Sequence, residues 1–269
     1  MSERVLDPAG FRALRFERLD AVLRVTIDHP ASALNAVDEL LHDELSRLFR
    51  ELRRETEARA VVLTGRGRAF SAGGDFGWFS TFEDLRQLEP LRHDARQLLY
   101  DLLDVELPVV AALNGPAVGL GASIALLCDV IFMAETATVA DPHVRVGVVA
   151  GDGGTVIWPL VLGPARAKQY LLTGDPVTAA EAERLGLVNR VVAPEALQDE
   201  ALAFARRLAD GAPLALRYTK LAINQTLKQA ALAAFDVATA LEIVTFQSAD
   251  HREALAALRE KRKPRFDGR

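Results

Sequence analysis

Two glycine-rich segments hold the residues best suited to chemistry on a negatively charged group. The first is Ser71-Ala72-Gly73-Gly74-Asp75, and the second runs from Asn114 to Gly121. Glycine lets a ligand approach backbone N–H donors closely, because it has no side chain. The second segment opens an expected helix, whose free N–H groups and dipole favour negative charge. The alternative is that both segments are only tight turns, since glycine chiefly marks turns.

A histidine and an aspartate nine residues apart could activate water. His143 follows a proline, and Asp152 lies in the glycine-flanked turn at 151–154. A histidine oriented by a carboxylate can remove a proton from water near neutral pH. Other interpretations stay open: a solvated His143, an Asp152 that only caps the next helix, and a Ser123–His143–Asp152 triad for acyl transfer. Ser123 could also be a small residue where bulk does not fit.

Short apolar strands alternate with helices over the first two thirds of the chain, which predicts an α/β fold. We expect strands at 22–28, 60–64, 109–113, 130–134 and 138–140. A further strand is expected where Val144, Val146 and Val148 alternate. Helices are expected at 37–57, 92–103, about 120–128, and after the turn at 151–154. Residues 76–91 contain Trp78 and three phenylalanines and are expected to form an irregular loop over a site.

The remaining part of the chain is mainly helical in pattern. The expected helices cover 165–173, 179–185, 194–209, 213–232 and 233–259. Alanine- and leucine-rich surfaces such as 230–246 could cover another subunit.

The composition fits a globular protein and excludes several classes. The chain has 269 residues, a net charge of −5 and 50% hydrophobic residues, so most of it is not disordered. Its single cysteine excludes a disulfide framework and suits a reducing cytoplasm. The acidic balance argues against a nucleic-acid-binding protein. The histidines show no metal-ligand spacing, so no metal site is predicted.

One uncharged stretch could suggest a membrane. Leu107–Cys128 has 22 residues without a charge, the length of a membrane-spanning helix. Prolines and glycines interrupt it, so we read it as a strand, a loop and a buried helix. No signal peptide is visible at the N-terminus, and the expected location is the cytoplasm, away from membranes.

Seven segments, in order along the chain, resemble those of the crotonase superfamily, also called the enoyl-CoA hydratase/isomerase family. They are Phe70–Asp75, Asn114–Gly121, Leu127–Asp129, Gly153–Thr155, Leu172–Gly174 with Ala179–Ala182, Gly186–Val192, and Glu260–Phe266. One such motif is weak, but seven in register are specific. The resemblance implies a spiral core of ββα units over residues 1–205. It also implies a C-terminal helical trimerisation region over 206–269, with trimers that can pair into hexamers.

The resemblance further implies a substrate and a shared reaction step. The substrate would be an acyl thioester of coenzyme A, as in fatty-acid metabolism, and no separate cofactor is expected. Two backbone N–H groups, those of Gly74 and Leu120, would form an oxyanion hole that stabilises an enolate. The family's substrate-binding positions correspond to Ala33, Leu34, Ala72, Gly74, Asp75 and Gly119.

The chain departs from the family's hydratases at two positions. Those enzymes hold one water between two glutamates, and here Ser123 and His143 stand at these positions. Segments 142–143, 151–153 and 156–159 instead resemble 6-oxocamphor hydrolase, a relative that cleaves a carbon–carbon bond in a cyclic β-diketone without coenzyme A. Asp152 also matches, loosely, the nucleophilic aspartate of 4-chlorobenzoyl-CoA dehalogenase. The departure predicts that His143 and Asp152 replace the glutamate pair.

Three hypotheses about function follow. The first, which the resemblance favours, is a lyase or isomerase of the hydratase/isomerase family that acts on an acyl-CoA thioester. The second is a β-diketone hydrolase, and the third is a protein that binds acyl-CoA without catalysis. The basic run Arg259–Arg265 fits either coenzyme A phosphates or a solvated helix end.

Overall fold

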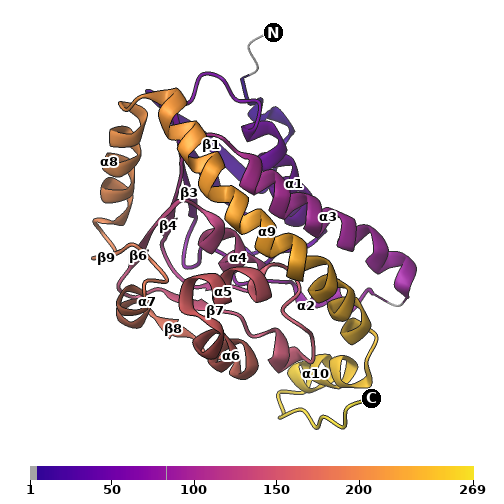
Figure 1. Cartoon of the computed structure of the whole chain (residues 1–269). Coiled ribbons are helices and arrows are strands. Elements are labelled where there is room, and N and C mark those ends of the chain that lie inside the picture. Colours follow the sequence, from indigo (N-terminus) through magenta and orange to yellow (C-terminus); the bar gives the residue numbers. More distant parts are fainter. Residues whose placement is uncertain (1–4, 83) are drawn as a thin grey trace.

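Parallel strand pairing dominates the larger of two sheets. The computed structural model describes residues 5–82 and 84–269, and Figure 1 shows its elements. Six strands form the larger sheet, in the order β1 (Leu14–Leu19), β2 (Val22–Ile27), β3 (Ala60–Gly65), β4 (Val109–Leu113), β6 (Val130–Ala134) and β9 (Arg190–Val192). Only the β1–β2 pair of this sheet is antiparallel. Both faces of β3 and β4 are buried, as expected for parallel strands in an α/β fold.

A smaller sheet lies beside the first and leads into the site. It contains β5 (Ala117–Val118), β7 (Thr138–Ala140) and β8 (Val177–Thr178). The helices are α1 (Glu39–Leu52), α2 (Phe76–Phe79), α3 (Leu85–Asp104), α4 (Leu120–Leu127), α5 (Gly154–Leu162), α6 (Pro164–Thr173), α7 (Ala179–Leu185), α8 (Leu197–Ala209), α9 (Pro213–Phe246) and α10 (Ala249–Arg259). Two 3₁₀ helices, η1 (Pro8–Gly10) and η2 (His143–Val146), complete the described elements. This mixed α/β arrangement agrees with the predicted fold class.

The uncharged stretch forms the interior of the molecule. All residues of β4 and α4 are buried, so charged side chains would have no place there. The predicted strand, loop and buried helix are therefore confirmed, and the absence of charge reflects burial in the core.

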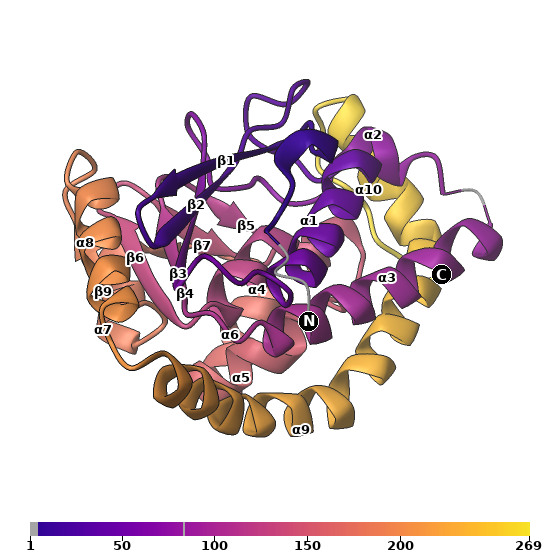
Figure 2. The ribbon, with the colours of Figure 1, turned by 90° about the horizontal axis from the view of Figure 1, so that it is seen from above.

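The long helix α9 crosses one face of the molecule (Figure 1). It packs against α3 and α5, and in Figure 2 it curves along one edge of the spiral. The helix α10 follows after a break at Ser248, whose side chain accepts the N–H of His251. The expected division at residue 205 stays a prediction.

Several expected elements differ in the structure. The strand expected at Val144, Val146 and Val148 is wrong: η2 occupies this region, and Gly147, with a left-handed φ of 69°, ends it. Residues 76–91 are not all irregular, because they contain α2 and the first turns of α3. A capping box at Asp84 starts α3 earlier than expected. The two helices expected at 213–232 and 233–259 divide instead near residue 247, and β1, β8 and β9 were not expected.

Candidate active site

The first glycine-rich loop is fixed by hydrogen bonds from both sides. The N–H of Ala72 donates to the carbonyl of Leu34 at 2.9 Å, and Ser71 Oγ donates to the carbonyl of Asn35 at 2.8 Å. The N–H of Val118 in turn donates to the carbonyl of Ser71 at 2.9 Å, which joins the two glycine-rich loops. Gly73 has a φ of 80°, and a Cβ there would lie 2.9 Å from the carbonyl oxygen of Val118. The loop therefore requires glycine at this position.

The second loop ends at the N-terminus of α4. Gly119 has a φ of 53°, and its N–H donates to the carbonyl of Ala140 at 3.0 Å. The N–H of Asp75 donates to Val37 at 2.9 Å. By contrast, the N–H groups of Gly74 and Leu120 have no hydrogen-bond partner among the described residues. These two predicted donors are thus free to bind another acceptor.

One cavity brings the two predicted donors together with the predicted proton-transfer groups. This inner cavity is lined by Gly74, Leu120, His143 and Asp152. The rest of its wall comes mainly from apolar and aromatic side chains, with one further histidine and one further carboxyl group: Val37, His42, Trp78, Phe79, Leu91, Ala95, Glu242 and Phe246. The arrangement resembles a substrate pocket, with a few polar groups in an apolar wall.

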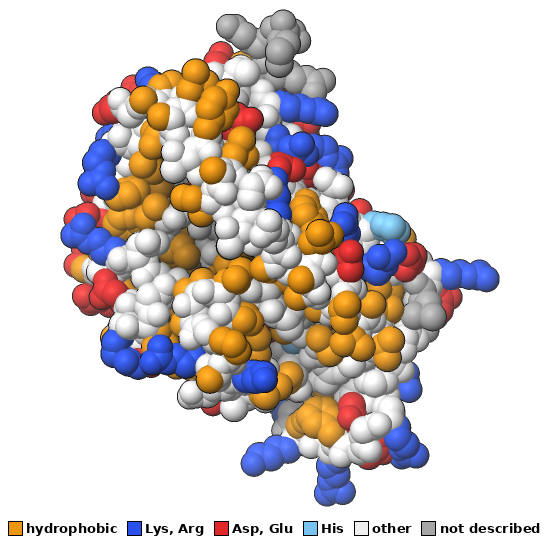
Figure 3. Space-filling model, in the orientation of Figure 1, with side chains coloured by type: hydrophobic (Ala, Val, Ile, Leu, Met, Phe, Trp, Pro, Cys, Tyr) orange, Lys and Arg blue, Asp and Glu red, His pale blue; other side chains and the backbone are white. Residues whose placement is uncertain are grey.

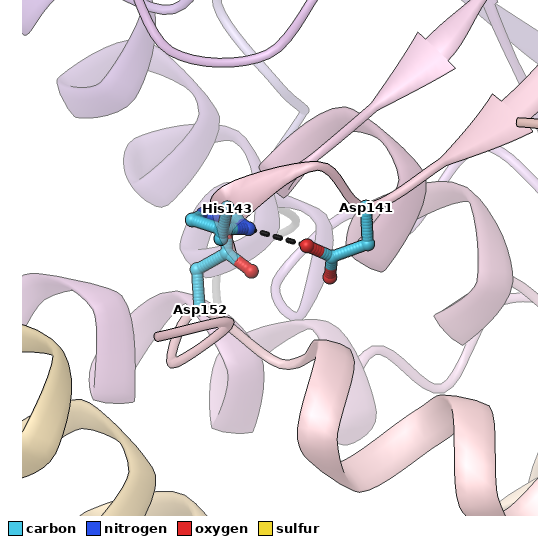
Figure 4. Close-up of side chains that lie close together, drawn as sticks. All are labelled: Asp141, His143 and Asp152. Carbon is cyan, nitrogen blue, oxygen red and sulfur yellow. Dashed lines mark hydrogen bonds and ion pairs between the residues drawn. The ribbon is translucent and has the colours of Figure 1, made fainter. Parts of the chain in front are cut away.

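His143 lies between carboxyl groups on both sides of its ring. Its Nδ1 contacts Asp141, as the dashed line in Figure 4 shows. Its Nε2 lies 3.4 Å from Asp152 Oδ2 and 3.8 Å from Glu242 Oε1. The side chain of Asp141 is completely buried, whereas those of His143, Asp152 and Glu242 retain 11–13% exposure. His143 is therefore not the solvated surface residue that its strand pattern allowed.

The buried charges change the protonation of two groups in this cluster. Burial lowers the pKa of His143, but the negative charges of Asp141 and Asp152 outweigh it and raise the pKa well above its usual value. Burial raises the pKa of Glu242 well above its usual range, although the neighbouring His143 lowers it. These shifts favour the protonated form of each group, an imidazolium at His143 and a neutral carboxyl group at Glu242.

Ser123 contacts the group formed by His143 and its three carboxyl neighbours through a hydrogen bond to Asp152. Its buried Oγ donates to Asp152 Oδ1 at 3.1 Å. A serine nucleophile needs a hydrogen bond to the histidine, so this order does not match a Ser–His–Asp triad. Asp152 is also not a helix cap, because Gly153 occupies the N-cap position of α5 without a side-chain hydrogen bond. Ser123 and Asp152 are both placed to orient the groups around His143.

The remaining predicted substrate-binding residues are spread over two places. Ala72, Gly74 and Gly119 line an outer cavity, which His143 also lines. Ala33 lines a separate hollow beside Arg66, and Leu34 is 41% exposed. Asp75 instead caps α2, accepting the N–H of Trp78 at 2.8 Å. A direct contact of these residues with substrate stays a prediction.

Sequence reasoning missed three residues of the site. Asp141 directly precedes Pro142, and no motif marks it as functional apart from its position two residues before His143. Glu242 comes from α9, almost a hundred residues later, and no spacing rule connects it to His143. His42 lies on α1 beside Trp78, with ring centroids 5.7 Å apart, and burial lowers its pKa. Only the fold brings these side chains to one cavity.

Asp141, His143 and Asp152 also form the one described group whose spacing could hold a metal ion. Their possible ligand atoms lie within 4.8 Å of one another. However, both nitrogens of His143 already face carboxylates, and Asp152 accepts from Ser123. The donor set fits a hydrogen-bonded network better than a metal site.

Comparison with known proteins places this chain in a family. The Enoyl-CoA hydratase/isomerase family model matches residues 17–269. The mitochondrial enoyl-CoA hydratase of Pongo abelii is 32% identical over 237 residues, covering 87% of this chain and 80% of the relative. An enoyl-CoA hydratase/isomerase from Mycobacterium paratuberculosis is 40% identical with a TM-score of 0.85, covering 91% of this chain and 97% of its own.

A further relative has a different printed activity. It is a β-diketone hydrolase from the cyanobacterium Anabaena, solved with (S)-3-oxocyclohexyl acetic acid bound. It is 33% identical with a TM-score of 0.84, and the match covers 89% of this chain and 96% of the relative. The motifs, the fold and these matches agree, and the chain is an enzyme of the enoyl-CoA hydratase/isomerase family, the crotonase superfamily.

Proposed function

We propose that the protein hydrolyses a carbon–carbon bond in a β-diketone, through an enolate bound by the N–H groups of Gly74 and Leu120. The observation that carries this proposal is the position of His143 and Asp152. Both face the same cavity as the two free N–H groups, and His143 stands where the family's hydratases have one of their two glutamates. Alkene hydration in the family uses two glutamates on one water, and this cavity lacks that pair.

The proposed reaction has two proton transfers. The His143–Asp152 pair removes a proton from water, and the hydroxide adds to one carbonyl carbon. The carbon–carbon bond then breaks, and its electron pair forms an enolate on the second carbonyl. The N–H groups of Gly74 and Leu120 stabilise this negative charge, each by about 3–4 kcal/mol in a preorganised site. The pair finally gives a proton to the enolate carbon, which yields a keto acid.

The walls of the inner cavity support an uncharged, compact substrate. Trp78, Phe79 and Phe246 supply apolar surface opposite the polar cluster. The ligand of the Anabaena relative is a keto acid, which is what hydrolysis of a bicyclic β-diketone yields. A bicyclic β-diketone that would yield such a keto acid is therefore our first choice of substrate.

A specific observation also favours an acyl-CoA thioester as the second candidate. The outer cavity adjoins Gly74 and His143 and ends beside Leu258 on α10. In Figure 3, basic side chains project around the end of the molecule that α10 and the C-terminus form in Figure 1. Arg262 is paired with Glu253 and Glu260, which raises the pKa of its guanidinium. The exposed Lys261 and Lys263 could face phosphates.

A paired substrate screen tests the two candidates. The purified protein is incubated with cyclohexane-1,3-dione, with a bicyclic 1,3-diketone, and with crotonyl-CoA, and the products are identified by mass spectrometry. We expect keto acids from the diketones. We expect His143→Gln to lower kcat by about 10²-fold or more, because a proton-transfer group is lost. His93→Gln, at an exposed histidine of α3, is the matched control and should retain full activity.

The other outcomes decide against the first proposal. Hydration of crotonyl-CoA with inert diketones would replace it with the thioester candidate. Tight binding of a CoA ester in calorimetry, without turnover of any compound, would favour a non-catalytic binding protein.

A further inference from the structure

Asp141 is a fully buried carboxyl group that the proposed reaction has not yet used. It lies directly after β7, and its side chain has no exposed surface. Its Oδ1 contacts Nδ1 of His143. Its Oδ2 has no hydrogen-bond partner among the described residues. A buried carboxylate costs several kcal/mol unless neighbouring groups compensate its charge, so its presence here needs a reason.

The start of α5 supplies one part of this compensation. A Cβ on Gly154, the first residue of α5, would lie only 2.0 Å from Asp141 Oδ2. Glycine at this position therefore allows the N-terminus of the helix to approach the carboxyl group. The positive end of the helix dipole stabilises a negative charge there. His143 lies on the opposite side of the same carboxyl group and supplies the second part.

The contact with Asp141 determines which ring nitrogen can act on a substrate. Because Nδ1 faces Asp141, only Nε2 faces the inner cavity, 3.4 Å from Asp152 and 3.8 Å from Glu242. Among the described residues, these three carboxyl groups are the titratable side chains that face His143, from the end of β7, the loop before α5, and α9. Burial raises the pKa of Glu242, so Asp141 and Asp152 are the carboxyl groups whose negative charge stabilises the imidazolium of His143.

We propose that Asp141 is a positioning residue that keeps His143 doubly protonated, with Nε2–H directed into the inner cavity. This proposal rests on the proposed function and gives each proton transfer to one group. Asp152 accepts the proton of water while hydroxide bonds to the carbonyl carbon. His143 Nε2–H then protonates the enolate carbon as the carbon–carbon bond breaks. Asp152 returns its proton to Nε2, which restores the starting state and balances the addition of one water.

The protonation of His143 can be measured without any substrate. In protein labelled with ¹⁵N-histidine, the ring signals of His143 are assigned by their absence in His143→Gln and then followed against pH. We expect both ring nitrogens of the wild type to stay protonated well above pH 7. In Asp141→Asn the midpoint should fall by at least about one pH unit, because an adjacent negative charge is lost.

The second measurement is the pH profile of turnover on whichever substrate the screen identifies. In Asp141→Asn we expect kcat to fall by about 10²-fold with little change in KM, since a proton transfer is impaired but binding is not. The alkaline limb of kcat should move to lower pH by the same shift as the NMR midpoint. A purely structural role would not move this limb.

Asp101→Asn is the matched control. Asp101 is also completely buried, but it contacts Arg53 between α1 and α3, away from the inner cavity. This variant should lower the melting temperature and leave the His143 midpoint and the pH profile unchanged.

Two results would overturn the role of Asp141. One is a wild-type His143 midpoint at or below about 6.5, the value of an ordinary histidine, which is decisive even if Asp141→Asn does not fold. The other is a folded Asp141→Asn protein with an unchanged midpoint. Failure of the proposed function is separate: the NMR shift would be present, but no diketone would be hydrolysed.

Discussion

Three carboxyl groups and one imidazole share a small buried volume, and they cannot all be charged at low cost. Two like charges in a site of low dielectric repel strongly, so one group takes up a proton. Glu242 is the group that does so, because burial raises its pKa and the charges of Asp152 and Asp141 raise it further. As a neutral acid it can donate a hydrogen bond into the cavity. The site thus contains one donor, Glu242, that family motifs do not reveal.

We expect Glu242→Gln to make the protein more stable at alkaline pH than the wild type. The folded-state pKa of Glu242 lies above its unfolded value of about 4.5, so the folded protein keeps a proton that the unfolded chain releases. Between the two pKa values the free energy of unfolding then falls by about 1.4 kcal/mol per pH unit. Glutamine has no proton to lose and avoids this fall. Urea denaturation at about pH 5 and about pH 8 measures the difference.

Glu200→Gln serves as the control for this measurement, because the side chain of Glu200 on α8 is 41% exposed and forms only a surface ion pair with Arg190. It should change stability little at either pH. An equal stability difference between wild type and Glu242→Gln at both pH values would contradict a raised pKa.

The short helix α2 determines how the two cavities are separated. A Cβ built on Gly74 would lie 1.9 Å from Phe79 Cζ, so the phenylalanine ring covers the loop that carries one predicted donor. Phe79 packs against Phe246 with ring centroids 5.3 Å apart, in a T-shaped arrangement. The inner and outer cavities share Gly74, Phe79 and His143. The ring of Phe79 therefore forms part of the wall between them.

Phe79→Ala should widen the range of substrates. Removing the ring would join the two cavities, so a bulkier diketone could reach the free N–H groups. We expect kcat/KM for a substrate with a larger ring substituent to rise by about tenfold relative to the smaller one, the usual scale of steric selection in apolar pockets. Phe76→Ala is the control, because Phe76 is 46% exposed and lines only the outer cavity. An unchanged substrate preference would contradict the role of Phe79.

The elements divide into those that a local pattern determines and those that it does not. The strands at β4, β6 and β7 and the helices at α4 and α7 could be predicted closely, because a continuous apolar run or a Gly or Pro boundary marks each of them. The segment η2 could not, since three alternating valines imitate a strand. Pro142, the left-handed Gly147 and the hydrogen bond from Arg145 Nε to the carbonyl of Thr173 at 2.9 Å form a turn instead.

The residues of the site also divide into those that a local sequence pattern reveals and those that it does not. The two donor loops and the His143–Asp152 pair could be proposed from local motifs. Asp141, Glu242 and His42 could not be assigned, because their roles depend on burial and on neighbours from distant segments.

At the scale of the whole molecule, α9 exposes an apolar surface that the monomer does not cover. Large hydrophobic side chains along it are 51–66% exposed: Leu214, Tyr218, Ile223, Leu232, Val237, Leu241 and Val244. Figure 3 shows hydrophobic side chains gathered on this face. The helix is long and apolar enough to cross a membrane by composition, but a single such helix is weak evidence for one. This number of large exposed hydrophobic side chains on one helix favours contact with another protein subunit.

We expect a charge on this surface to weaken the trimer that the family resemblance implies. In Leu232→Glu, assembly would bury a carboxylate without a partner, so the trimer should dissociate. Sedimentation velocity should then give the monomer mass, with the helical circular dichroism unchanged. Leu172→Glu, at a residue 70% exposed on α6, is the control and should leave the mass unchanged. A wild-type protein that is already monomeric would contradict the prediction.

The parallel pairing of β2, β3, β4 and β6 has a consequence for how the protein acquires activity. Each of these pairs joins strands about 20 to 50 residues apart, so folding must close long loops before the sheet is stable. The donors, His143 and Glu242 come from four separate segments and meet only after those closures. Recovery of turnover after dilution from denaturant should therefore follow the slowest refolding step. The reaction itself can serve as a measure of complete folding.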